Sequence, residues 1–249
     1  MKIFESSQYL RSIELKRDKI ESFSKYPFCL PIIKNLLSLN FHPKVTYIVG
    51  ENGSGKSTIL EAIATAYGFN PEGGTINFTF TTNDTHSELY NYVRIIKGFM
   101  RPKDGFFLRA ESFYNLASNI DELDKERPGL FKSYGGRSLH EQSHGESFFA
   151  VFMNRFKGKG LYILDEPEAA LSPSRQMSML SRIHDLVGQD CQFIIATHSP
   201  IIMAYPDSII YEIKNGINQV KYEETEHYLI TKSFLNNTEG MLDILLKEK

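Results

Sequence analysis

The chain has 249 residues, of which 41% are hydrophobic and 23% are charged, a composition typical of a globular protein and unlike that of a disordered chain. Lysine and arginine total 28 against 30 aspartate and glutamate residues. The formal net charge of -2 argues against a protein held on nucleic acid by bulk charge, although a local basic patch is still compatible with it. No apolar run approaches the roughly 20 residues that span a bilayer, so we do not expect an integral membrane protein.

The first half of the chain predicts a strand, a glycine-rich loop and a helix in succession. β-Branched and aromatic side chains dominate the strand, and Gly68 and Pro71 end the helix. In chain order the predicted elements are a strand at 45–49, a helix at 57–67, a strand-forming segment at 75–82, an ambiguous segment at 91–99 and a strand at 105–110.

The second half alternates helices with short apolar strands. In chain order we predict a helix at 119–125, an apolar helix at 147–156, a strand at 161–164, a helix at 174–187, strands at 192–196 and 207–213, and one or two helices over 224–249. Phe148, Phe149, Phe152 and Phe156 recur at helical spacing and predict a face packed in the core. Strands that alternate with helices predict a parallel sheet with helices on its faces.

Residues 50–58 (GENGSGKST) form a phosphate-loop motif between a predicted strand and a predicted helix. The glycines let the backbone wrap a phosphate with its N–H groups, and the helix N-terminus favours anions. Lys56 is expected to reach the β- and γ-phosphates, and the Ser57 hydroxyl to ligate Mg²⁺. The predicted nucleotide-binding residues of this loop are Asn52, Gly53, Ser54, Gly55, Lys56, Ser57 and Thr58.

A second motif is the apolar strand that ends in two carboxylates, Asp165 and Glu166, followed by Pro167. At the carboxyl end of a parallel strand, Asp165 is expected to hold the Mg²⁺ shell together with Ser57. Glu166 is expected to orient or deprotonate the attacking water. A strand that ends in an acidic turn is common, and its pairing with a phosphate loop is what favours this interpretation.

Three further motifs occur in a fixed order around the acidic pair. Residues 143–147 (SHGES) open a helix before it, residues 169–173 (AALSP) follow it, and residues 197–200 (THSP) close the next strand. Their order and spacing resemble the signature motif, the D-loop and the switch histidine of ATP-binding-cassette ATPases. The resemblance covers roughly residues 39–206.

The resemblance implies an α/β fold of the P-loop NTPase class. It would have a cassette-type parallel core sheet flanked by helices, an antiparallel β portion on the N-terminal side and a helical signature lobe at about 112–155. We expect residues 1–249 to form a single ATPase domain with a helical tail at about 224–249.

The resemblance also implies roles for individual residues. In the family the signature motif acts on nucleotide held by the other subunit, so Ser143, Gly145 and Glu146 are expected to contact ATP across an ATP-dependent homodimer. His198 is expected to donate to the γ-phosphate, and Glu166 and His198 are the expected catalytic residues. The implied ligands are ATP and Mg²⁺.

Two departures from the family pattern stand out. His144 and Glu146 replace the central Gly and the Gln of the signature form typical of transporter subunits. The glutamine expected after the strand at 105–110 is also absent, and Glu111 occupies its place as a candidate contact to Mg²⁺ or water.

The chain most resembles the small stand-alone predicted ATPases of the cassette superfamily, which are related to RecF-like and overcoming-lysogenisation-defect ATPase domains. Only about 85 residues separate Ser57 from Ser143, which leaves no room for long coiled-coil arms. We expect an ATP-driven switch that acts with a separate partner protein, in DNA repair or phage defence. The alternatives are the energy subunit of a membrane transporter and a non-catalytic nucleotide-sensing module.

Cysteine and histidine spacing predicts no metal site. Cys29 and Cys191 lie far apart outside any Cys-x-x-Cys pattern, so we expect no disulfide framework and a reduced, cytoplasmic location. The remaining histidines show no ligand spacing with one another or with acidic residues, and no transition-metal site is expected from them: His42, His86, His140, His184 and His227.

Overall fold

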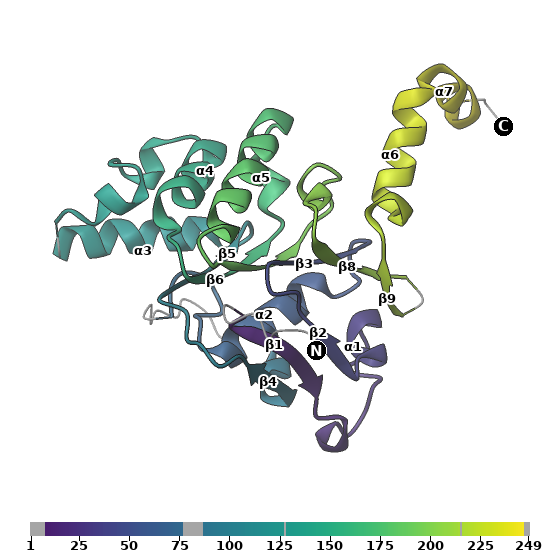
Figure 1. The fold of residues 1–249 in the computed structure, drawn as a ribbon, viewed down its shortest axis with the longest axis horizontal. Helices are drawn as coiled ribbons and strands as arrows, with labels where there is room; N and C mark the ends of the chain where they lie inside the picture. Colours follow the sequence, from purple (N-terminus) through teal and green to yellow (C-terminus); the bar gives the residue numbers. More distant parts are fainter. Residues whose placement is uncertain (1–7, 77–86, 127, 215, 247–249) are drawn as a thin grey trace.

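A six-stranded sheet in the order β5-β6-β7-β3-β8-β9 lies at the centre of the computed structural model, which describes residues 8–76, 87–126, 128–214 and 216–246 (Figure 1). Neighbouring strands run parallel except for β9, which is antiparallel to β8. Strands β3, β6 and β7 are buried along their whole length, which explains their unbroken apolar runs. The strands are β3 (Val45–Gly50), β5 (Asp104–Arg109), β6 (Gly160–Asp165), β7 (Gln192–Ala196), β8 (Ser208–Ile213) and β9 (Ile217–Val220).

A separate three-stranded antiparallel sheet contains β1 (Leu10–Leu15) between β2 (Ser38–Asn40) and β4 (Val93–Lys97). It confirms the antiparallel β portion expected on the N-terminal side. The ambiguous segment 91–99 supplies β4, whereas β1 and β2 were not predicted. Of the strand expected at 75–82, residues 77–82 lie outside the described residues.

One fully buried side chain joins the two sheets. Gln192, at the start of β7, accepts hydrogen bonds at Oε1 from the backbone N–H groups of Tyr9 (3.0 Å) and Leu10 (2.8 Å). Its Nε2 donates to the carbonyl oxygens of Leu10 (2.7 Å) and His42 (3.0 Å). A buried amide with all four hydrogen bonds made fixes the position of one sheet relative to the other.

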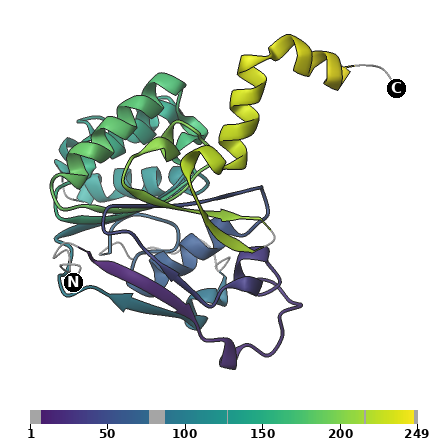
Figure 2. The same ribbon diagram turned by 45° about the vertical axis from the view of Figure 1, so that its right-hand side comes forward.

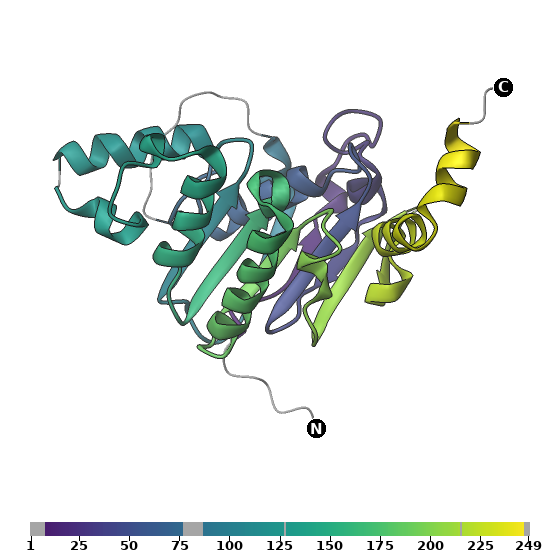
Figure 3. The same cartoon turned by 90° about the horizontal axis from the view of Figure 1, so that it is seen from above.

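Helices cover both faces of the central sheet (Figures 1 and 3). On one face lie α1 (Pro31–Asn35), α2 (Lys56–Tyr67) and the antiparallel sheet, and their apolar side chains form one core cluster. On the other face, α3 (Phe113–Glu126), α4 (His144–Arg155) and α5 (Pro173–Val187) form a second cluster. Phe148, Phe152 and Phe156 are buried there, which confirms the predicted core face for these three, whereas Phe149 is only partly buried.

The last two helices, α6 (Glu226–Asn236) and α7 (Thr238–Leu246), extend away from the sheet (Figure 2). Neither helix contains a buried residue. Helix α6 begins beside the β8–β9 hairpin, so its first turn lies close to the phosphate loop while the rest projects outward. Within the described ranges, we find no helix with the length and apolar character needed to cross a membrane.

Candidate functional site

The carboxyl ends of three parallel strands, β3, β6 and β7, meet at one edge of the sheet and bring the predicted motifs together. Strand β3 leads into the phosphate loop, β6 ends at Asp165 and β7 ends just before Thr197. Backbone hydrogen bonds continue past these ends, from Glu166 N–H to Ala196 O (3.0 Å) and from Thr197 N–H to Ile48 O (3.4 Å). Motifs more than 100 residues apart in sequence are therefore neighbours in space.

The phosphate loop requires glycine at Gly55. Its φ of 97° lies in the left-handed region, and a Cβ there would meet Ile32 Cγ2 at 2.7 Å. Ile32 belongs to α1, and its N–H donates to Ser54 O at 3.3 Å. Helix α1 therefore supports the loop from behind while the N-terminus of α2 faces outward.

Lys56 supplies the positive charge of the site, and the loop backbone holds its ammonium group in place. The Lys56 ammonium donates to the carbonyl oxygens of Gly50 and Glu51, at 2.9 Å each, and the side chain is only 4% exposed. Burial lowers the pKa of Lys56, while Glu166, Asp165 and Glu168 act in the opposite direction. The first N–H groups of an α-helix lack intrahelical acceptors, so those at the start of α2 are available to an anion.

Ser57 and Asp165 form a pair of oxygen donors suited to Mg²⁺. The Ser57 hydroxyl donates to Asp165 Oδ1 at 3.0 Å, and Asp165 is 4% exposed. Burial raises the pKa of Asp165 to about 6, against the lowering effects of Arg109 and Ser57. Mg²⁺ is commonly held by one or two protein oxygens together with phosphates and water, so these residues fit it. The described residues hold no cluster of three or more His, Cys, Asp or Glu side chains that would bind a metal alone.

Arg109, at the end of β5, is a site residue that the sequence did not indicate. Its Nη1 donates to Glu61 Oε2 at 2.8 Å, and its Nε lies 3.8 Å from Asp165 Oδ2. Glu111 accepts from Arg109 Nη2 at 3.2 Å and is 82% exposed. The contact that reaches Asp165 from this strand thus comes from Arg109, and Glu111 stays a predicted contact to Mg²⁺ or water.

Glu166 and His198 face each other beside the loop. Glu166 has a left-handed φ of 50°, an unusual backbone conformation for a non-glycine residue that places it in the sharp turn after β6. Its Oε1 lies 3.4 Å from His198 Nε2. Burial lowers the pKa of His198, as do Lys56 and His227, while Glu166 raises it. The ring is therefore biased toward its neutral form.

The Glu168 carboxylate makes different contacts from the Glu166 carboxylate. Its carboxylate accepts from the Thr197 hydroxyl at 2.8 Å and from the backbone N–H of His198. Burial raises the pKa of Glu168, and these two hydrogen bonds lower it. Glu168 thus holds the segment that carries His198, and both of its carboxylate oxygens already have partners.

His227, on α6, is a second neighbour of the switch histidine. Its Nε2 lies 2.9 Å from His198 Nδ1, which is hydrogen-bond distance. His227 shows no ligand spacing in the sequence, and its contact with His198 links residues 29 positions apart on different elements. The spacing rule that excluded a metal site could not indicate this pair, because the contact depends on where α6 begins.

The signature residues lie at the start of α4. The backbone N–H and the hydroxyl of Ser143 donate to Glu146 Oε2, at 3.2 and 2.8 Å, as part of a capping box. The Ser143 hydroxyl is the main cause of a lowered pKa for Glu146. Arg175 Nη2 lies 3.7 Å from Glu146 Oε1.

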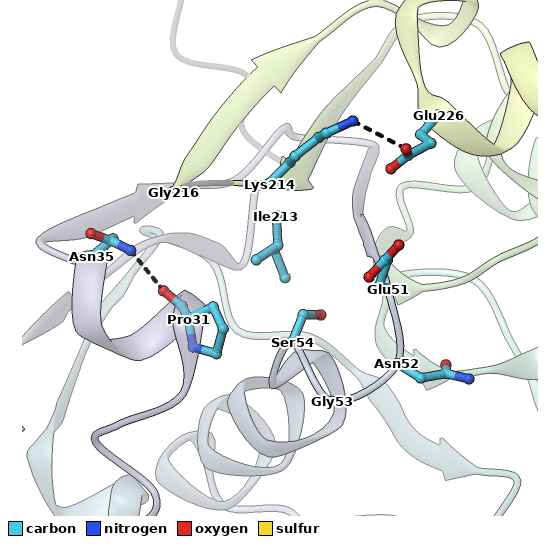
Figure 4. A pocket seen from close by; sticks show the side chains of 10 residues that line it. All are labelled: Pro31, Asn35, Glu51, Asn52, Gly53, Ser54, Ile213, Lys214, Gly216 and Glu226. Atoms are coloured by element: carbon cyan, nitrogen blue, oxygen red, sulfur yellow. Dashed lines mark hydrogen bonds and ion pairs between the residues drawn. The ribbon is translucent and has the colours of Figure 1, made fainter. Parts of the chain in front are cut away.

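Three hollows show how these groups are distributed. The central hollow, of about 560 Å³, is lined by Glu51, Asn52, Glu166, Glu168, Ala169 and His198. A second hollow lies on the other side of the phosphate loop and reaches the Lys214–Glu226 ion pair (Figure 4). Glu146 instead lines a third hollow with Arg137, Phe149 and Arg175. The signature motif and the phosphate loop of one chain therefore line separate hollows.

Comparisons with known proteins place the chain in a family. A family model described as an AAA domain matches residues 19–144, just over half of the chain. A second, described as an AAA domain, putative AbiEii toxin, Type IV TA system, matches residues 104–204. Among curated proteins, the chain is 26% identical over 197 residues to the zinc import ATP-binding protein ZnuC of Wigglesworthia glossinidia brevipalpis, covering 72% of this chain and 75% of that protein.

Solved structures with a similar course of the chain include two from bacteria. One is cbiO1 of Clostridium perfringens, part of the ABC transporter complex cbiONQ, with a TM-score of 0.49 and 20% identity over 97% of this chain and 100% of that one. The other is the SMC head domain of Thermotoga maritima, with a TM-score of 0.44 and 18% identity over 86% of this chain and 99% of that one.

The phosphate loop between β3 and α2 and the acidic end of β6, which meet at one edge of a parallel sheet, are the arrangement of a P-loop NTPase. The chain belongs to the AAA-domain family, and it is an ATPase.

Proposed function

We propose that the protein is an ATP-driven switch whose two copies close around MgATP and act on a separate partner protein. The observation that supports this most is the central hollow, where residues from the ends of β3, β6 and β7 converge. Phosphoryl transfer is catalysed mainly by positioning and charge neutralisation, and this edge of the sheet supplies both.

In this proposal the loop residues Asn52, Gly53, Ser54, Gly55 and Thr58 hold the phosphates together with Lys56 and Ser57. Ser57 and Asp165 would hold Mg²⁺, with Glu111 nearby, and the ion supplies charge neutralisation on the phosphate oxygens when bound. Lys56, now turned to the carbonyl oxygens of Gly50 and Glu51, would exchange those acceptors for phosphate oxygens.

Glu166 is the proposed base that orients and deprotonates the attacking water. Both oxygens of Glu168 are already occupied by Thr197 and His198, which makes Glu168 the weaker candidate. Glu166 lines the central hollow, and His198 presents Nε2 beside it. His198 Nε2, which lies 3.4 Å from Glu166 Oε1, is the nitrogen that would donate to the γ-phosphate.

The proposed dimer follows from the position of the signature residues. Ser143, Gly145 and Glu146 cap a helix that lines a different hollow from the phosphate loop of the same chain. They would complete the site of the opposite copy, so that hydrolysis depends on closure. Large exposed apolar side chains on α6 and α7, with none buried, also favour contact with another chain.

A second candidate is the energy subunit of a membrane transporter. The observation in its favour is the relative ZnuC, a zinc import ATP-binding protein, which matches 72% of this chain. The signature form with His144 and Glu146 and the absence of the Q-loop glutamine favour the switch that acts on a separate partner. Co-purification with a membrane-spanning protein would decide for the transporter.

Two substitutions test the assigned roles. Lys56→Ala should abolish MgATP binding in isothermal titration, because the phosphates lose their main cation. Glu166→Gln should keep MgATP affinity and lower turnover by about 10² or more, the usual scale for a positioned base. Glu223→Gln, the same change on an exposed residue that does not line the central hollow, is the matched control and should behave like the parent.

The two substitutions can each contradict a different assignment. Unchanged MgATP affinity in Lys56→Ala would overturn the phosphate-loop assignment. If Glu166→Gln kept the turnover of the parent, Glu166 would not be the base, and Asp165 and Glu168 would be the remaining candidates.

A further inference from the structure

The switch histidine has a partner outside the cassette motifs. His198 Nδ1 and His227 Nε2 are 2.9 Å apart, with ring centroids at 5.0 Å and planes inclined by 60°. The other ring nitrogen of His198 lies 3.4 Å from Glu166 Oε1, at the central hollow. His198 is thus held between the proposed base and a histidine of α6.

The position of His227 is fixed by the first turn of α6. The N–H of Glu226 donates to Glu212 Oε1 of β8 at 2.8 Å, a favourable place for a carboxylate at a helix N-terminus. The Glu226 side chain pairs with Lys214 at 3.0 Å, visible above the phosphate loop in Figure 4. Thr225 is fully buried. These contacts hold the start of α6 against the sheet, although the rest of the helix projects outward.

The chemistry of two neutral imidazoles restricts how this contact can be made. Burial is the main cause of a lowered pKa for both His198 and His227. In a hydrogen bond between two neutral rings, one nitrogen must carry the proton and the other must accept it. If His227 donates from Nε2, then His198 Nδ1 is the acceptor and the proton of His198 is on Nε2, the nitrogen at the central hollow.

We propose that His227 is a positioning residue that donates to His198 Nδ1 and so holds the switch histidine as the Nε2–H tautomer, ready to donate to the γ-phosphate. The proposal rests on the role given to His198 above and adds the residue that controls it. It also makes turnover depend on the placement of α6.

Turnover of the 249-residue chain tests the catalytic consequence. His227→Leu removes the donor and should lower kcat for ATP hydrolysis by about 10-fold to 100-fold, with KM changed less than about twofold. The reason is that the wrong tautomer of His198 weakens stabilisation of the transition state more than binding of ATP. His227→Gln offers an amide N–H in its place and should restore most of kcat. His184→Leu, the same change on the outer surface of α5, is the matched control and should leave kcat unchanged.

A double-mutant cycle separates positioning from an independent role. If His227 acts through His198, the double variant His198→Ala/His227→Leu should be no slower than His198→Ala alone. Multiplied losses in the double variant, or equal losses in His227→Leu and His227→Gln, would overturn the proposal.

Nitrogen-15 spectra of histidine-labelled protein read the tautomer directly and do not depend on activity. The parent should show His198 protonated on Nε2 with Nδ1 as acceptor, and His227→Leu should shift it toward a mixture of tautomers. An unchanged His198 tautomer in His227→Leu would contradict the proposal. If the tautomer shifts while His198→Ala retains full turnover, the positioning contact stands and the proposed role of His198 in hydrolysis fails instead.

Discussion

Asp165 is a site residue whose burial lowers the stability of the folded protein at neutral pH. Burial raises its pKa to about 6, above the value of about 3.9 for an unfolded chain. The native state therefore holds the proton more tightly than the unfolded state between about pH 4 and pH 6. As the pH rises through that window, the native state must ionise a buried group and the free energy of unfolding falls.

Asp165→Asn should consequently raise the free energy of unfolding of the nucleotide-free protein at pH 7 by on the order of 2 kcal/mol, with little effect below pH 4. The amide oxygen can still accept from Ser57, and Arg109 keeps its contact with Glu61. Urea unfolding at pH 7 and at pH 4 measures the difference. A stability loss at pH 7 would show that Asp165 is held by net favourable contacts.

A matched control is Asp104, a partly buried aspartate paired with an arginine. Its carboxylate accepts twice from Arg155 Nη1, at 3.0 and 2.8 Å, and once from the Tyr162 hydroxyl. Asp104→Asn should destabilise the protein by about 3 kcal/mol, because it leaves the half-buried guanidinium without its counter-charge. The opposite signs at the two positions distinguish a functional carboxylate from a structural one.

Some residues of the site lie in short sequence motifs, and others reach the site only through tertiary packing. The phosphate loop, the acidic pair and the switch histidine each lie in a short motif at the end of an apolar strand, so the sequence indicates them directly. Arg109, Glu168 and His227 carry no such signal. Their contacts with Glu61, Thr197 and His198, respectively, join residues 29 or more positions apart, and only the packing of strands and helices makes these contacts.

At the scale of elements, the central strands were predictable because burial on both faces demands unbroken apolar runs. Strand β1 was missed for a physical reason. A bulge between Leu10 and Ser12 shifts its pairing with β4, and the alternation of buried and exposed side chains is irregular. The helix predicted at 119–125 begins earlier, as α3 at Phe113, because three further apolar residues there pack into the core.

The junction between the two sheets gives a prediction at this scale. Gln192→Leu would leave the buried N–H groups of Tyr9 and Leu10 without their acceptor, so it should lower the free energy of unfolding by about 4 kcal/mol. Gln219→Leu, the same change on the exposed part of β9, should alter it by no more than about 0.5 kcal/mol. Equal effects in urea unfolding would show that the amide network does not hold the sheets together.

For the molecule as a whole, the proposed dimer makes hydrolysis a property of two copies. A nucleotide between the phosphate loop of one copy and Ser143 of the other would add contacts only in the closed state, so MgATP should drive association. Light scattering on Glu166→Gln should therefore show dimers with MgATP and monomers with MgADP, which lacks the γ-phosphate. A monomer at high concentration with MgATP would contradict closure.

Complementation between two inactive variants tests the shared site without relying on affinity. Lys56→Ala removes the phosphate-loop cation, and Ser143→Arg blocks the signature surface, so each variant alone should lack turnover. In a mixed dimer one site carries both changes, but the other joins an intact phosphate loop to an intact signature. Mixing the two in equal amounts should restore about a quarter of parent turnover if pairing is random, because half of the dimers are mixed and each has one good site. A site contained within one chain predicts no recovery at any ratio, and full turnover by Ser143→Arg alone would reduce Ser143 to a helix cap.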